Sequence, residues 1–231
     1  MQQNGKAIVG LDSSGSTLTV AVSCLGKICT RRRTGIKQER LLFPALKSAL
    51  AACNAQMTDI GGVFIVRGPG RFTGIRISLT FASMLKYLNH AQVRGATLFE
   101  VLRKQTEDSS AFKKWQKENP SGVLGVVLHA FREEYFLQFF DDTKSAPLWL
   151  SREELLKRLE TYARPLFLAG SAKDEKPLET LLGPAFAYAA KRDCFVRPAT
   201  LLAMAQEDRW TENALEPLYL KPARFELVTP K

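Results

Sequence analysis

The chain has 231 residues, of which 45% are apolar, and this is enough for one large or two small packed domains. No apolar run approaches the roughly 18 residues that a membrane-spanning helix needs, and residues 1–6 do not begin a signal peptide, so we expect a cytoplasmic protein with no membrane association. The net charge of +10 favours an acidic partner such as nucleic acid, although scattered basic groups without an RNA-binding aromatic motif are more simply a solvated surface.

The cysteines and histidines exclude most metal chemistry. The four cysteines include no CxxC pair, and the two histidines, His90 and His129, are far apart in the sequence. Neither a zinc helix of the HExxH type nor a Cys/His cluster with metal-ligand spacing can be built from them. We therefore predict no metal site.

The first part of the chain predicts a meander of three strands followed by alternating helices and strands. Apolar runs and alternation predict strands, and runs rich in Leu and Ala predict helices. The strands are at 7–11, 18–24, 28–33, 63–66 and 93–96, and the helices are at 41–53, 72–88 and 98–104. We expect Pro44 in the first turn of the first helix, where proline is tolerated, and a break in the chain at Gly61 and Gly62.

A charged, apolar-poor stretch at 105–119 predicts a domain boundary, with lobes at 1–104 and 105–231. Beyond it we expect a hairpin of strands 123–128 and 135–140, a capped helix at 151–162, a strand at 166–169 and a helix at 198–205. The last helix and the tail are free to pack back on the first lobe. The second lobe partly repeats the first, which is the order of an α/β actin-like ATPase (ASKHA, RNase H-like) fold, with two lobes of mixed sheets flanked by helices.

The segment GPGRFTG, which begins at Gly68, invites comparison with phosphate-binding loops, because glycines before a helix let backbone N–H groups approach an anion. Its spacing fits neither the GxxxxGK[ST] nor the GxGxxG pattern. A tight strand-to-helix turn is therefore the favoured interpretation, with nucleotide binding as the alternative.

The helix at 72–88 has an unusually wide apolar surface. Placed on a helical wheel, its apolar residues cover an arc of roughly 220°, more than one sheet can cover. The part of this apolar arc that the sheet leaves uncovered faces either a partner or the first helix of the same chain. The predicted partner-interface residues are Leu42, Leu46, Leu50, Ile75, Leu79 and Ala82.

Polar residues follow the first strand, where actin-like ATPases place an acidic residue and hydroxyls near phosphate and Mg²⁺. Asp12 and Ser13 are therefore candidate cofactor-binding residues. An Asp-Ser-Ser sequence at the end of a strand is also common turn chemistry, which is the favoured interpretation. We predict no catalytic residue.

Several segments, in order, make the chain resemble the TsaB (YeaZ) family. They are IVGLDSS, LLFPAL, VRGPGRFTGIRISL, HAFREEYF, LAGSA and EPLYLKP. The family-motif residues are Gly68, Pro69, Gly70, Phe72, Thr73, Gly74 and Arg76. The chain departs from the family pattern at Ser13 and Arg71, where Thr and Ser are usual, and at 129–131, which reads His-Ala-Phe instead of Asp-Ala-Arg.

The resemblance implies a non-catalytic scaffold or activator subunit of a threonylcarbamoyl transferase complex. In that family the subunit binds the catalytic subunit TsaD, is joined by the ATPase TsaE, and can pair with a second copy of itself through helices of the first lobe. TsaD forms N6-threonylcarbamoyladenosine next to the anticodon of ANN-decoding tRNAs, so tRNA is a partner through the complex. The resemblance implies no cofactor of the subunit's own, with ATP or ADP at the interface of the assembled complex.

Two other functions remain open from the sequence. An independent actin-like ATPase or small-molecule kinase would use the Asp12 turn and would need a second phosphate loop. A basic RNA-binding module would bind tRNA alone, with a steep salt dependence.

Overall fold

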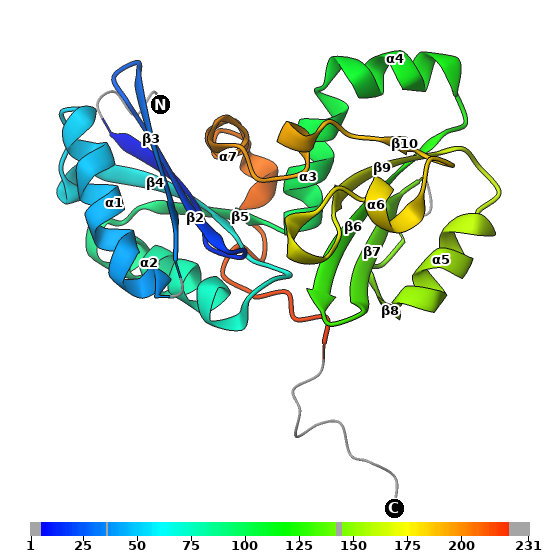
Figure 1. Cartoon of the computed structure of the whole chain (residues 1–231). Coiled ribbons are helices and arrows are strands. Elements are labelled where there is room, and N and C mark those ends of the chain that lie inside the picture. The colour runs from blue at the N-terminus through cyan, green and yellow to red at the C-terminus, as the bar shows by residue number, and fades with distance from the viewer. Residues whose placement is uncertain (1–5, 36, 142–144, 222–231) are drawn as a thin grey trace, which may run out of the picture. The chain divides into compact units, whose positions relative to one another are not determined.

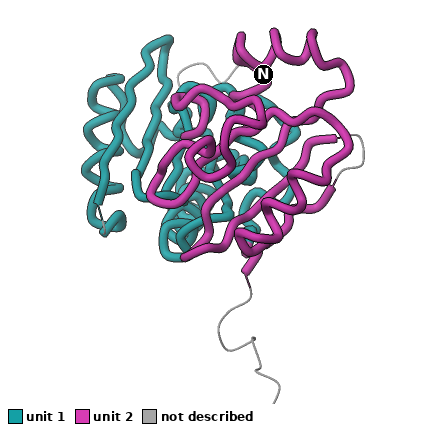
Figure 2. Tube along the Cα trace, turned by 45° about the vertical axis from the view of Figure 1, so that its right-hand side comes forward, with its two compact units in different colours: residues 1–101, 196–218 teal, residues 102–195, 219–231 magenta. Residues whose placement is uncertain are grey.

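The computed structural model describes residues 6–35, 37–141 and 145–221, and within them the chain forms two compact units. Residues 1–101 and 196–218 make up the first unit, and residues 102–195 and 219–231 the second (Figure 2). The helix near residue 200 thus belongs to the first unit. The described ranges contain no helix with the length and apolar character of a membrane span.

The first unit is built on a five-stranded mixed sheet of order β3-β2-β1-β4-β5. Strands β1 (Ala7–Asp12), β2 (Thr17–Cys24) and β3 (Lys27–Thr34) form the antiparallel meander. Strands β4 (Ile60–Val66) and β5 (Gln92–Ala96) continue parallel to β1. β1 and β4 read as nearly continuous apolar runs because both of their faces are covered.

Helices cover both faces of this sheet (Figure 1). Helices α1 (Gln38–Ala52) and α2 (Phe72–Asn89) share a buried core with Val63 and Ile65 of β4. The alternate residues of β4 pack on the other face with α7 (Pro198–Met204). Side-chain alternation along one strand therefore builds two hydrophobic layers.

Two details of the first unit differ from the predictions. Helix α1 begins at Gln38, so Pro44 lies in its second turn; the Gln38 amide holds the helix start by donating to the carbonyl of Gly15 at 2.9 Å. Proline has no N–H, so Pro44 cannot donate to the carbonyl of Arg40 one turn earlier. Pro44 is exposed, so that carbonyl faces water. The predicted break at Gly61 and Gly62 is also wrong.

Both of these glycines lie inside β4 and are buried. The pairing of β4 with β1 shifts register between Ala7 and Ile8, so one extra residue of β4, Gly61, is accommodated there. A Cβ on Gly61 would lie 2.4 Å from the Lys6 side chain. The glycine permits a close approach inside the strand and does not end it.

The second unit repeats the scheme with a sheet of order β10-β9-β6-β7-β8. Its strands are β6 (Val123–Phe131), β7 (Glu134–Phe140), β8 (Leu148–Ser151), β9 (Leu166–Ser171) and β10 (Ala187–Tyr188). As in the first sheet, the first three strands form a meander and the last two run parallel to its first strand. The predicted actin-like fold class with two mixed sheets is confirmed.

The helices of the second unit follow local sequence signals. Helix α5 (Arg152–Glu160) starts at a capping box in which Ser151 and Glu154 satisfy each other's backbone N–H groups. The charged stretch at 105–119 is largely helical: it contains the end of α3 (Leu98–Glu107) and all of α4 (Ser110–Glu118). The short β8, β10 and α6 (Glu179–Leu182) carry no periodic signal and were not predicted.

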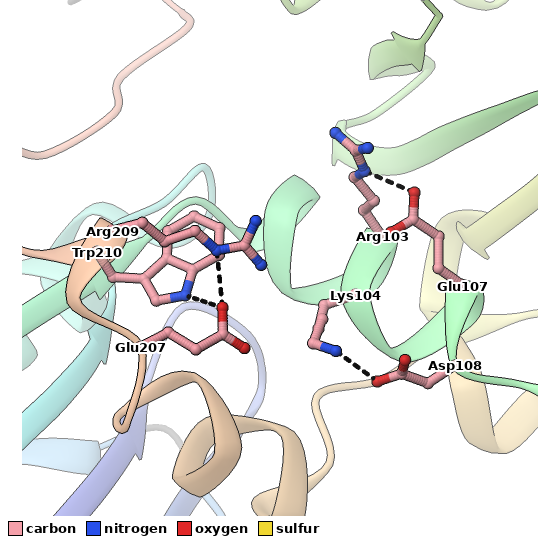
Figure 3. Close-up of polar contacts among 7 residues, drawn as sticks. All are labelled: Arg103, Lys104, Glu107, Asp108, Glu207, Arg209 and Trp210. Carbon is pink, nitrogen blue, oxygen red and sulfur yellow. Dashed lines mark hydrogen bonds and ion pairs between the residues drawn. The ribbon is translucent and has the colours of Figure 1, made fainter.

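The charges of α3 pair along its surface. Arg103 contacts Glu107 at 2.7 Å, and Lys104 contacts Asp108 at 2.9 Å, both at i,i+4 spacing (Figure 3). Such exposed pairs stabilise a helix by about 0.3–0.5 kcal/mol each. They add modestly to the stability of the last turns of α3.

Candidate functional site

The loop between β4 and α2 lies directly on the turn that follows β1. The backbone N–H of Arg71 donates to the carbonyl of Ser14 at 2.7 Å. A Cβ on Gly70 would lie 2.4 Å from that same oxygen, and a Cβ on Gly74 would lie 1.9 Å from the carbonyl oxygen of Ser13. Two glycines of the motif therefore serve a close backbone-to-backbone contact.

The side chains of the turn are bonded within the protein. Asp12 Oδ1 accepts from the N–H of Ser14 at 2.9 Å and from its hydroxyl at 2.7 Å. The Ser13 hydroxyl donates to the Gly74 carbonyl at 2.7 Å and shares a short hydrogen bond with the Ser78 hydroxyl. All of these groups are buried, and both turn hydroxyls direct their hydrogens to protein acceptors. The structure thus brings the candidate cofactor residues, Asp12 and Ser13, into contact with the family motif.

Burial controls the electrostatics of this turn. It raises the pKa of Asp12, against the opposing effects of the two Ser14 hydrogen bonds and the charge of Arg32. A carboxyl whose pKa is higher in the folded than in the unfolded chain stabilises the fold below its unfolded pKa, and this contribution is lost as the pH rises through its folded pKa. The ionised form of Asp12 is therefore unfavourable in the folded chain relative to the unfolded chain.

Asp12→Asn should relieve this cost. The amide oxygen can still accept both Ser14 hydrogen bonds, and the variant has no charge to desolvate. We expect its free energy of unfolding to rise relative to the wild type between about pH 4, near the ordinary Asp pKa, and pH 7. Urea denaturation of both proteins at several pH values measures this difference. A variant whose free energy of unfolding falls relative to the wild type as the pH rises would contradict the prediction.

The first half of the motif is joined to the tail. Gly68 has φ +113, and a Cβ there would lie 2.6 Å from the carbonyl oxygen of Leu218. The N–H of Leu218 donates to the Arg67 carbonyl at 2.8 Å, and the N–H of Leu98 donates to the Gly68 carbonyl at 2.6 Å. The buried Pro69 follows a cis peptide bond. The loop and the tail both carry sequence motifs of the same family, but the sequence did not predict that the two segments are in contact.

The remaining motif side chains face outward. Phe72 is 51% exposed, and the Arg76 guanidinium stacks over its ring at 3.9 Å. Thr73 and Arg71 are exposed beside them. The motif therefore has an inner part that holds the turn and an outer part at the start of α2.

The predicted partner-interface face needs correction. Leu79 is partly buried and packs on the core of the first unit. The other predicted residues are buried: Leu42, Leu46, Leu50 and Ala82 lie inside that core, and Ile75 lies under the loop beside Gly68. The reason is that α1 itself covers this side of α2, with the Phe43 and Phe81 rings edge to face at 6.0 Å. In the folded chain only Leu79 of these side chains keeps a partly exposed surface.

A different face of α2 is open. Its exposed residues follow one another at helical spacing, and we call them the α2 outer row: Thr73, Arg76, Thr80, Ser83 and Tyr87. Tyr87 is 81% exposed, and its neighbour Leu88 is 62% exposed. A search of the sequence for small and polar residues at three- and four-residue steps would have found this row.

The hairpin of the second unit carries the remaining departures from the family pattern. His129 Nε2 is hydrogen-bonded to the carbonyl of Arg132 at 2.9 Å, and Arg132 has φ +54 at the tip of the turn. Phe131 is 47% exposed, with Lys221 above its ring at 5.5 Å. In this chain the hairpin therefore presents an aromatic ring and cations. Across the described residues, no three His, Cys, Asp or Glu side chains gather as a metal site.

The fold and this turn define a protein of the actin-like class in which the β1 turn is covered by the chain's own loop. The family model for TsaD, described as tRNA N6-adenosine threonylcarbamoyltransferase, matches residues 36–107. The solved structure of YeaZ from Pseudomonas aeruginosa superposes with a TM-score of 0.64 at 19% identity, covering 93% of this chain and all of that one.

The curated relatives carry a single name. The tRNA threonylcarbamoyladenosine biosynthesis protein TsaB of Bacillus subtilis (strain 168) is 21% identical over 224 residues, which is 95% of this chain and 96% of the relative. TsaB of Escherichia coli (strain K12) is 26% identical over 152 residues, 63% of this chain and 59% of the relative. The resemblance to the TsaB (YeaZ) family is confirmed.

Proposed function

We propose that this chain is the non-catalytic scaffold and activator subunit of the complex that forms N6-threonylcarbamoyladenosine beside the anticodon of ANN-decoding tRNAs. TsaD is its catalytic partner, and TsaE joins the assembly. The similarity to proteins named TsaB supports the pathway. The observation that carries the non-catalytic role is the covered turn after β1.

In an actin-like ATPase this turn would have to offer hydrogen-bond donors to a phosphate. Here the Ser13 hydroxyl donates to Gly74, and the hydroxyl and N–H of Ser14 donate to Asp12. Binding a phosphate at this turn would require breaking these buried bonds, each of which contributes roughly 1 kcal/mol. The subunit accordingly has no nucleotide of its own, and ATP or ADP binds only at the interface of the assembled complex.

The partner surface we propose is the α2 outer row with Phe72 and Phe43 beside it. The small side chains of Thr80 and Ser83 allow another helix to approach, and Tyr87 supplies aromatic area, which is typical of binding hot spots. Because the TsaD family model matches the segment containing α1 and α2, the partner carries a similar helix pair. Like surfaces can pair with each other, so the same face would form a homodimer in the absence of TsaD.

Mixing the purified chain with its cognate TsaD tests the proposal. We expect the two to elute together on size-exclusion chromatography, and we expect no ATP turnover by the isolated chain above that of a buffer control. Separate elution at micromolar concentrations would refute the scaffold role. Turnover by the isolated chain would instead favour the ATPase or small-molecule kinase alternative.

A further inference from the structure

The positive charge of this protein is concentrated in one part of the chain. Residues 13–99 contain twelve Lys and Arg but only two acidic residues, Glu39 and Asp59. The net charge of this segment is therefore +10, equal to that of the whole protein, and the rest of the chain is balanced. An asymmetry of this kind indicates a surface for an acidic partner.

Seven of these cations lie on β3, on α1 and on the segment between them, and we call them the β3 strip. They are Lys27, Arg31, Arg32, Arg33, Lys37, Arg40 and Lys47. β3 is an edge strand of its sheet, and α1 runs beside it (Figure 1). Arg31 is partly buried and the other six are exposed.

Specific contacts hold the two elements of the strip together. Arg31 Nε donates to the Ser48 hydroxyl at 2.9 Å, and Arg31 Nη2 donates to the Ser48 carbonyl at 3.2 Å. The thiol of Cys53 lies 3.8 Å from the carbonyl of Lys27, so α1 returns antiparallel to β3. Lys47, next to Ser48, therefore lies close to the arginines of the strand.

The cations of the strip are not neutralised within the described parts of the chain, where none of the seven forms an ion pair with a carboxylate. In contrast, Arg94 contacts Asp208 at 2.6 Å. Charges on an edge strand also discourage unwanted strand pairing, but this does not account for Lys37, Arg40 and Lys47, which lie outside β3. Eight strand residues extend over about 26 Å, enough to follow several consecutive phosphates of one nucleic-acid strand.

We propose that the β3 strip binds the phosphodiester backbone of RNA. The exposed Arg32 and Arg33 favour phosphate, because the guanidinium fork makes bidentate, charge-assisted hydrogen bonds with phosphate oxygens. As neighbours on an edge strand they leave opposite faces of the sheet and flank its free edge. The inference rests on the proposed function, in which the substrate of the complex is a tRNA, and it assigns to this subunit a direct part in holding that substrate. Contacts with phosphates alone give binding that is independent of base sequence and strongly dependent on salt.

The test compares two triple variants of the full chain that have the same net charge. R32Q/R33Q/K47Q removes three exposed cations of the strip and leaves Arg31 and its bonds to Ser48 in place. K113Q/K114Q/K117Q removes three exposed lysines from α4 in the other unit. Urea denaturation of both variants establishes that they are folded before binding is measured.

Fluorescence anisotropy with a transcribed ANN-reading tRNA, between about 50 and 200 mM salt, gives the affinity and its salt dependence. We expect R32Q/R33Q/K47Q to bind at least about tenfold more weakly, with the slope of log K against log salt lower by about 1 for each cation removed. The α4 variant should bind within about twofold of the wild type. Equal losses in both variants, or none in either, would overturn the proposal.

Two further measurements separate this inference from the proposed function. R32Q/R33Q/K47Q should still elute with TsaD, since the strip is distinct from the α2 outer row. If TsaD binds and RNA affinity is unchanged, only the RNA inference falls. If polyglutamate binds the strip and tRNA does not, the surface is for an acidic protein and the proposal is refuted.

Discussion

Gly74→Ala should destabilise the first unit by about 3 kcal/mol or more, although alanine is the better helix former. Gly74 is the third residue of α2, where helix propensity alone predicts a gain of roughly 1 kcal/mol. The added Cβ would lie 1.9 Å from the backbone oxygen of Ser13, a contact that no rotamer change can relieve. Either the turn or the helix must move, which breaks the buried hydrogen bonds of Ser13.

Gly15→Ala is the matched control for this substitution. Gly15 belongs to the same turn, yet nothing lies within 4 Å of a Cβ placed there. The free energy of unfolding of Gly15→Ala should lie within about 0.5 kcal/mol of the wild-type value. Urea denaturation followed by circular dichroism compares the three proteins; a Gly74→Ala variant as stable as Gly15→Ala would show that the loop does not rest on the turn as described.

Ala82→Glu should destabilise the first unit strongly and Ser83→Glu should leave its stability almost unchanged, although the two residues are neighbours on α2. Ala82 is fully buried in the core beneath α1, so a carboxylate there would be desolvated without a partner. We expect loss of at least about 3 kcal/mol of stability, and hence a largely unfolded first unit. Ser83 is exposed in the outer row, and Ser83→Glu should change the stability by less than about 0.5 kcal/mol.

Binding to TsaD tests Ser83→Glu, the variant that should remain folded. A charge at the centre of the proposed interface weakens a complex by about 2 kcal/mol, which is roughly thirtyfold in Kd. Folded Ser83→Glu should therefore lose TsaD on size-exclusion chromatography, and its circular dichroism spectrum should match the wild type. A folded Ala82→Glu variant that fails to bind TsaD would instead support the partner interface predicted from the sequence.

The Gly74→Ala prediction treats the GPGRFTG loop as a structural element. In this chain its glycines do not surround an anion; they allow the loop and the start of α2 to lie on the Asp12 turn and, through Gly68, on Leu218. The exposed Phe72 and Arg76 are then presented at the start of the helix that we propose for TsaD binding. A single motif thus lies against the buried Asp12 turn and also begins the open face of α2.

Much of the fold could be predicted from local patterns. The apolar runs of β1 and β4, the alternation of β2 and the Ser151 cap all act within a few residues, so they are readable in the sequence. The wrong prediction of a chain break at Gly61 had a different cause. A glycine is a local signal for a turn, but here it serves contact with Lys6, which directly precedes β1.

The face of α2 could not be chosen from the sequence for a related reason. Two adjacent arcs of the helix are apolar, and periodicity does not say which neighbour covers each of them. Packing of α1 through Phe43 and Phe81 decided that Ala82 is a core residue, and the loop at Gly68 covers Ile75. Only the exposed remainder, the α2 outer row, is available to a partner.

By itself, the sequence determined the actin-like fold class, the resemblance to TsaB and the character of the loop as a turn outside the phosphate-loop patterns, because these depend on spacing along the chain. Only the tertiary structure decided what the motif touches. Ser13 and Gly74 are 61 residues apart, and no local pattern encodes the contact of their backbones. Burial depends on which elements pack together, so the closed turn and the open face of α2 became visible only in the folded protein.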